Sequence, residues 1–97
     1  MNKITLAMDN YNKVHNYTFN LIDAFVLDTV VSNSYKTDAH LAQQALCSER
    51  TIKRSINKLC ICGILEKHLA YNNTKSLILN KKAYNNLLNY KGSIPNV

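Results

Sequence analysis

The chain has 97 residues, which suits one domain, although a core of this size is marginal without a partner. A hydrophobic content of 46% excludes a disordered coil, and no apolar run reaches the roughly 18 residues that a membrane span needs. The N-terminal residues have too short an apolar stretch for a secretory signal, so we expect a cytoplasmic protein. The formal charge of +6 is uneven, because residues 1–47 sum to −1 and residues 48–97 sum to +7. A basic half suits a polyanionic partner, but a lysine-rich surface without a partner would have the same charge.

The first segment alternates apolar and polar residues. Ile4, Leu6 and Met8 are spaced as in a short strand, and Lys13–Tyr17 is the candidate return strand after a turn-like Asp9–Asn12. Residues 1–16 are therefore expected to form an N-terminal extension with a possible β-hairpin. Residues 17–91 are the predicted domain, and residues 92–97 a loose tail.

Phe19–Val31 is predicted to be a helix capped by Thr18 or Asn20. Nine of its thirteen residues are apolar, which leaves almost no polar face. A helix that is apolar all round is covered on more than one side. In so small a domain a second protomer would supply the other covering surface, so we expect a homodimer.

A short helix follows, capped by Thr37 or Asp38 and ended by Cys47. The inward residues expected on it are Leu41, Ala42, Ala45 and Leu46.

Ser48–Cys60 is predicted to be the next helix, with the Ser48 hydroxyl as its N-cap and Gly63 as its left-handed exit. At one hundred degrees per residue, an apolar stripe formed by Ile52, Ile56 and Leu59 faces the core, with Ser55 beside it. The opposite face presents Arg50, Arg54 and Asn57, flanked by Lys53.

These side chains suit the major groove of DNA, since Arg can pair with guanine and Asn with adenine in a bidentate manner. Ser48, Thr51 and Lys58 lie nearer the edges of the helix and suit phosphates. The alternative is a solvated basic face on a structural helix.

The remaining elements are two strands and a helix. Ile64–Tyr71 and Ser76–Leu79 are the predicted strands, joined by the polar turn Asn72–Lys75. Asn80 is expected to cap a last helix, Lys81–Tyr90. Its inward residues should be Tyr84, Leu87 and Leu88.

One stretch carries a family pattern: Leu41-Ala42, then Ser48-Glu-Arg50-Thr51-Ile52, then Ile56, Leu59 and Gly63-Ile64-Leu65. It resembles the winged helix-turn-helix family, and the return strand and helix that begin at Leu77 resemble it too. The resemblance covers residues 19 to about 90. It implies a mainly α fold with a small β-hairpin, the wing, and binding of double-stranded DNA.

In this family the wing often follows the minor groove or the DNA backbone, where Lys and Asn serve well. The candidate wing contacts are Lys67, Tyr71, Asn72, Asn73 and Lys75. An ordinary polar hairpin tip is the alternative.

Neither metal nor enzymatic chemistry is indicated. Cys60 and Cys62 have one spacer instead of two, and Cys47 is remote, so we expect structural thiols in a reducing compartment. The three histidines are dispersed, and no glycine-rich phosphate loop or carboxylate pair is present. We expect no catalysis, no cofactor and no small-molecule ligand.

The leading hypothesis is a homodimer that binds specific double-stranded DNA sequences. The chain resembles small plasmid and phage proteins that act in replication, conjugative transfer, partition or repression of transcription. The alternative is a winged-helix interaction module, an adaptor or inhibitor, that does not bind DNA.

Overall fold

The computed structural model describes residues 3–69 and 75–89. Within them the chain forms five helices and one antiparallel hairpin, so the prediction of a mainly α fold with a small β-hairpin is confirmed. The elements, in chain order, are α1 (Lys3–His15), α2 (Leu21–Val31), α3 (Asp38–Ala45), α4 (Glu49–Ile61), β1 (Leu65–Leu69), β2 (Lys75–Leu79) and α5 (Lys81–Leu88). In the described ranges, no helix has the length and apolarity needed to cross a bilayer.

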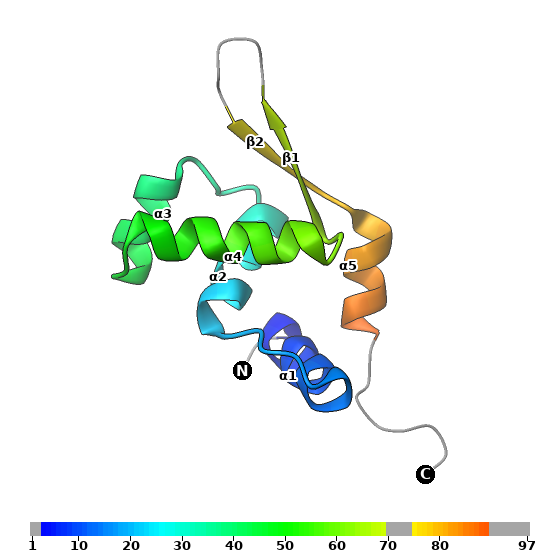
Figure 1. The fold of residues 1–97 in the computed structure, drawn as a ribbon. Coiled ribbons are helices and arrows are strands. Elements are labelled where there is room, and N and C mark those ends of the chain that lie inside the picture. The colour runs from blue at the N-terminus through cyan, green and yellow to red at the C-terminus, as the bar shows by residue number, and fades with distance from the viewer. Residues whose placement is uncertain (1–2, 70–74, 90–97) are drawn as a thin grey trace.

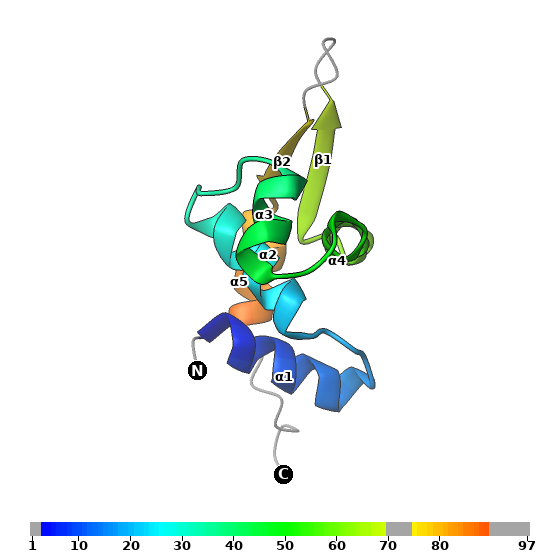
Figure 2. The same cartoon turned by 90° about the vertical axis from the view of Figure 1, so that its left-hand side faces the viewer.

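Helix α2 occupies the centre of the molecule. It contacts α1, α3, α4 and β2, while α1 also packs against α5 (Figures 1 and 2). Val26 and Leu27 are fully buried. The other elements of the same chain therefore cover part of the apolar surface of α2, whereas Leu21 (73% exposed) and Val31 (37% exposed) stay at the surface. The apolar composition of α2 is thus explained only in part within one chain.

The prediction of an N-terminal strand or hairpin is wrong, because residues 3–15 form α1. Ile4, Ala7 and Met8 are buried, and Tyr11 packs partly against them, at the spacing of one helical face. Leu6, which completed the apparent alternation, is 51% exposed. The helix ends before Asn16, whose φ of 53° is tolerated by asparagine. Helix α1 thus contributes to the common core.

The segment between α1 and α2 is held by side-chain amides. Asn12 both donates to the Phe19 carbonyl and accepts from the Phe19 amide, each at 2.8 Å. Phe19 is buried but precedes the helix, which begins at Leu21. Of the two predicted caps, Asn20 is the one observed: its side chain accepts from the Asp23 amide at 3.0 Å. The Asp23 carboxylate in turn accepts a hydrogen bond from the backbone N–H of Asn20, which completes a capping box.

Helix α3 begins at the predicted cap Thr37, and Leu41 and Ala42 are buried as expected. The expectation that Leu46 points inward is wrong, because its side chain is 93% exposed. Leu46 has a φ of 55° and ends the helix, so the chain turns there and the half-buried Cys47 packs against the core instead.

Tyr35 precedes α3 and donates to the Asp38 carboxylate at 2.7 Å. Burial, followed by this hydrogen bond, raises the pKa of Tyr35. The contact links the loop after α2 to the first turn of α3.

Gly63 connects α4 to the hairpin with a φ of 81°, as predicted. Ile64 after it is buried, and its carbonyl accepts from the Asn80 amide at 2.8 Å, which closes the base of the hairpin. Leu65 pairs with Leu79 and Lys67 with Leu77, so these four residues share one face of the sheet. Because Leu65 is buried and β1 packs against α4, this face is turned toward α4.

Helix α5 begins after the predicted cap Asn80, whose side chain accepts from the Ala83 amide at 3.1 Å. Tyr84 and Leu87 are buried and Leu88 is partly buried, as expected. The predicted last residue of this helix, Tyr90, and the tail 92–97 lie outside the described residues.

We predict that Ile4→Ala lowers the free energy of unfolding by about 2–5 kcal/mol, because Ile4 is only 3% exposed and its loss leaves a cavity in the core. Urea denaturation measures the change. Leu6→Ala on the same helix is the matched control and should cost less than about 1 kcal/mol. Equal effects of the two substitutions would contradict the packing of α1.

Candidate nucleic-acid interface

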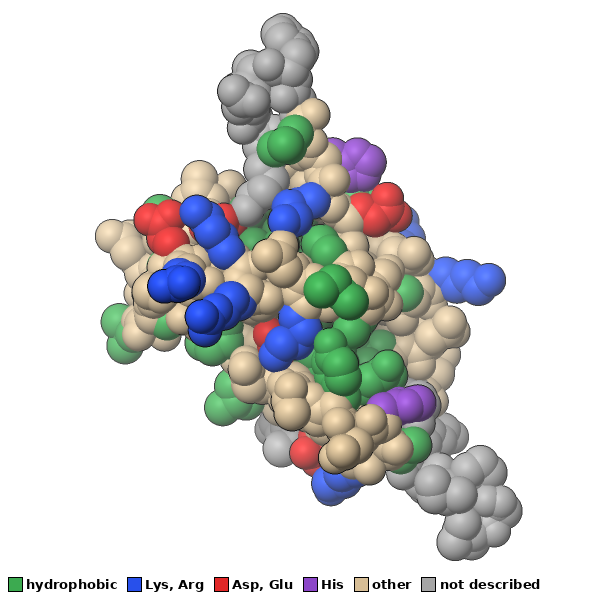
Figure 3. Space-filling model, in the orientation of Figure 1, with side chains coloured by type: hydrophobic (Ala, Val, Ile, Leu, Met, Phe, Trp, Pro, Cys, Tyr) green, Lys and Arg blue, Asp and Glu red, His purple; other side chains and the backbone are tan. Residues whose placement is uncertain are grey.

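Helix α4 separates apolar from basic side chains. Ile52, Ile56 and Leu59 are buried against the core, as the sequence predicts. Arg50, Lys53 and Arg54 are exposed on the other side of the helix. Lys and Arg side chains accordingly gather where α4 crosses the face of the molecule shown in Figure 3. This surface, formed by Arg50, Lys53 and Arg54, is named the basic face below.

The beginning of α4 is also as predicted. The Ser48 hydroxyl accepts from the Thr51 amide at 3.2 Å and lies 3.0 Å from the Thr51 hydroxyl. Ser48 is exposed and Thr51 is half-buried. Both hydroxyls therefore lie at the start of the helix, beside the basic face, while Ser48 satisfies one of the first amides.

A buried carboxylate joins α2 to α4. Asp23 is 1% exposed, and its carboxylate accepts hydrogen bonds from the Ser55 hydroxyl and, at 2.7 Å, from the Lys58 ammonium. The backbone N–H of Asn20 is the third donor to this carboxylate, so the buried charge has the partners that it requires.

The sequence contained a signal for this network. Asp23 stands on an otherwise apolar helix, and Ser55 and Lys58 are three residues apart on another helix, so they share a face. No sequence spacing indicated that α2 and α4 bring these groups together.

Lys58 was predicted to contact phosphate, but its ammonium is engaged within the fold. Besides the Asp23 carboxylate, it donates to the Thr18 carbonyl at 3.1 Å, and only 25% of its side chain is exposed. It thus ties the loop before α2 to α4. Lys58 lies next to Arg54 of the basic face, but its ammonium is engaged by Asp23 and Thr18.

Asn57 is exposed and lies beside the hairpin. Its Oδ1 accepts from the Lys67 ammonium of β1 at 2.6 Å. Lys67 belongs to the strand face turned toward α4, which explains the contact. The structure therefore brings together one candidate from the helix and one from the wing, which the sequence analysis had considered separately.

The other wing candidates are only partly placed. Lys75 begins β2, opposite Leu69. Tyr71, Asn72 and Asn73 lie outside the described residues.

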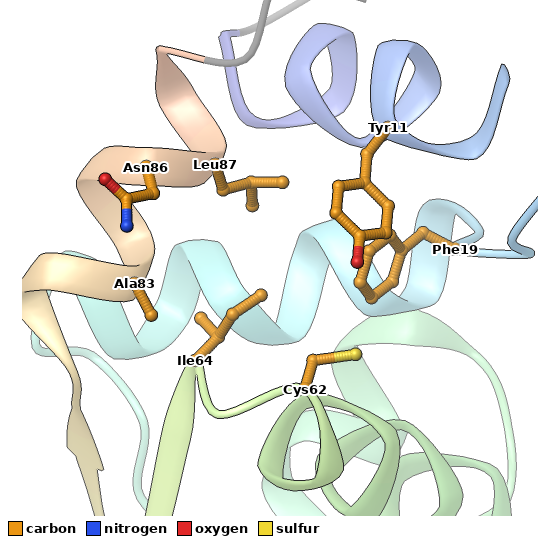
Figure 4. A pocket seen from close by; sticks show the side chains of 7 residues that line it. All are labelled: Tyr11, Phe19, Cys62, Ile64, Ala83, Asn86 and Leu87. Carbon is orange, nitrogen blue, oxygen red and sulfur yellow. The ribbon is translucent and has the colours of Figure 1, made fainter. Parts of the chain in front are cut away.

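Two hollows differ in their chemistry. One, of about 270 Å³, lies beside the basic face. Its lining consists of Asn20, Ile22, Asp23, Thr51, Arg54, Ser55 and Lys58. The other, of about 230 Å³, lies between α1, α5 and the end of α4, where Tyr11 and Leu87 point toward the space above Ile64 and Cys62 (Figure 4). No charged side chain lines the second hollow, so it offers nothing that would attract a polyanion.

The cysteines are half-buried thiols, and Cys62 donates to the Tyr17 hydroxyl at 3.4 Å. Within the described ranges, no group of three or more His, Cys, Asp or Glu side chains is arranged to hold a metal ion. Comparisons of the chain with protein-family models, with curated proteins and with solved structures found no match. The features of this chain that can indicate a function are therefore the surface of α4 and the hairpin.

We predict that Asp23→Ala lowers the free energy of unfolding by about 3 kcal/mol, because it removes the acceptor of three hydrogen bonds and leaves Lys58 without its counter-ion. The exposed Asp28 on the same helix gives the control, since Asp28→Ala should change stability by about 0.5 kcal/mol or less. Chemical denaturation measures both. If the two variants are equally stable, Asp23 does not hold α4 in place.

Proposed function

We propose that residues 19–89 form a winged helix-turn-helix domain that binds specific sequences of double-stranded DNA. The order α2, α3, α4, hairpin, α5 supports this proposal. So does the pairing of a short α3 with α4 through a tight turn. In the proposed complex α4 is the recognition helix, which enters the major groove, and the β1–β2 hairpin is the wing, which follows the adjacent backbone.

The single observation that carries the proposal is the basic face. Arg50, Lys53 and Arg54 are all exposed and lie opposite the buried stripe of α4. Arginine can pair with the N7 and O6 acceptors of guanine, and the lysine can neutralise a phosphate. Ser48 and Thr51 at the start of the helix would contact phosphate oxygens. Lys58 is left out of this interface because Asp23 and Thr18 engage its ammonium.

The basic face can be tested by salt dependence and substitution. Affinity for duplex DNA should fall steeply as salt is raised, because phosphate contacts release counterions. Arg54→Ala should weaken a selected site by about 1–3 kcal/mol and relax its base preference. Fluorescence anisotropy of labelled duplexes measures both effects.

Lys13 provides the control. It is exposed on α1, at the end of the molecule opposite the hairpin, so Lys13→Ala should leave binding nearly unchanged (Figure 1). If Arg50→Ala/Arg54→Ala binds normally while Lys75→Ala does not, the wing carries recognition. If no duplex is retained at low salt, the chain is better explained as a protein-interaction module.

We also propose that the protein acts as a homodimer on an origin of replication or transfer, a partition site or an operator. A single recognition helix reads few base pairs, and two half-sites one helical turn apart lengthen the recognised sequence. Light scattering at micromolar concentration should then give twice the chain mass of 11.0 kDa. The dimer would be excluded if the free protein has the mass of one chain and the complex has the mass of one chain plus one duplex.

A further inference from the structure

The contact between Asn57 and Lys67 determines which atoms Asn57 can offer to a base. The Lys67 ammonium lies 2.6 Å from one atom of the Asn57 amide group. An ammonium has three donors and no acceptor, so the amide atom that it contacts must be the oxygen. The oxygen of Asn57 thus accepts one hydrogen bond from a cation, while both hydrogens of its NH₂ group remain to meet a ligand.

Both side chains start from well-fixed backbone positions. Asn57 follows the buried Ile56 on α4, and Lys67 lies two residues after the buried Leu65 on the same face of β1. The contact therefore joins two elements that the core already holds side by side. Because one partner is charged, the hydrogen bond is stronger than one between neutral groups.

An asparagine that reads adenine needs both ends of its amide, since the oxygen accepts from the N6 amine while the NH₂ group donates to N7. The Lys67 ammonium occupies one of the two lone pairs of the Asn57 oxygen, and its positive charge beside that oxygen opposes the approach of a second donor such as the N6 amine of adenine. The remaining N–H groups of Asn57 and Lys67 are all donors. Guanine presents two adjacent acceptors, N7 and O6, in the major groove.

We propose that Asn57 and Lys67 act together as a donor-only pair that selects guanine over adenine at one position of the DNA site. This inference rests on the proposed function. It replaces the expected adenine contact of Asn57 with a specificity that depends on a residue of the hairpin.

Selection of bound duplexes from a random library tests the pair, with wild type, Lys67→Met and Asn57→Ala in parallel. The base position that loses its preference in Asn57→Ala is the one that Asn57 contacts. At that position wild type should prefer guanine over adenine by roughly tenfold. Lys67→Met releases the Asn57 oxygen, so adenine should become the preferred base there. Lys53→Met is the matched control, because Lys53 is an exposed lysine of α4: it should weaken binding to all duplexes without changing any preference.

The outcomes separate the inference from the proposed function. If wild type binds specific duplexes but prefers adenine at that position, or if Lys67→Met keeps the preference of wild type, the donor-only pair is wrong and DNA binding stands. If wild type retains no duplex at low salt, the proposed function fails and the inference fails with it.

A measurement without DNA checks the contact itself. The side-chain amide resonances of Asn57 should shift in Lys67→Met and stay unchanged in Lys13→Met, since Lys13 is exposed on α1. Unchanged resonances in both variants would overturn the pairing whatever the DNA measurements give.

Discussion

The buried carboxylate of Asp23 is the constraint on which the placement of α4 depends. A charge that is 1% exposed needs donors on every side, and here they come from the Asn20 backbone, Ser55 and Lys58. Apolar packing alone allows a helix to slide or rotate slightly at little cost, whereas the two directional hydrogen bonds from Ser55 and Lys58 of α4 do not. The Asp23 carboxylate therefore has two roles. It stabilises the start of α2 through the capping box with Asn20, and it fixes the rotation of α4 about its own axis.

That rotation decides which cations remain available on the surface. Lys58 turns inward to Asp23 and Thr18, while Arg50, Lys53 and Arg54 stay outward. Four of the five charges on α4 are positive, and the fold uses one of the positive charges for its own cohesion. The remaining three form the basic face, which is the surface that the proposed complex with DNA would use.

The hairpin adds a second element to this surface. Gly63 and the closing hydrogen bond from Asn80 to Ile64 set the direction in which β1 leaves α4, and Leu65 anchors the strand in the core. Lys67 then reaches Asn57. One charged hydrogen bond thus joins α4 to the hairpin. α1 takes no part in this arrangement, because it packs on α2 and α5.

The sequence by itself determined the elements whose signals are local. The caps Ser48 and Asn80, the stripe of Ile52, Ile56 and Leu59, and the turn at Gly63 all follow from hydrogen bonding or periodicity within a few residues. For the caps of α2 and α3 the sequence left two candidates each, and the structure selects Asn20 and Thr37. The prediction from sequence was wrong where two local patterns competed. Ile4, Leu6 and Met8 alternate as in a strand, but Ile4, Ala7 and Met8 also fit one face of a helix, and the helix is what forms. Only the tertiary structure decided which lysines have partners within the fold and which stay exposed on the surface of α4. The contacts of Lys58 with Asp23 and of Lys67 with Asn57 join residues 35 and 10 positions apart. The position of such partners in space depends on how whole elements pack, and no spacing along the chain encodes that packing.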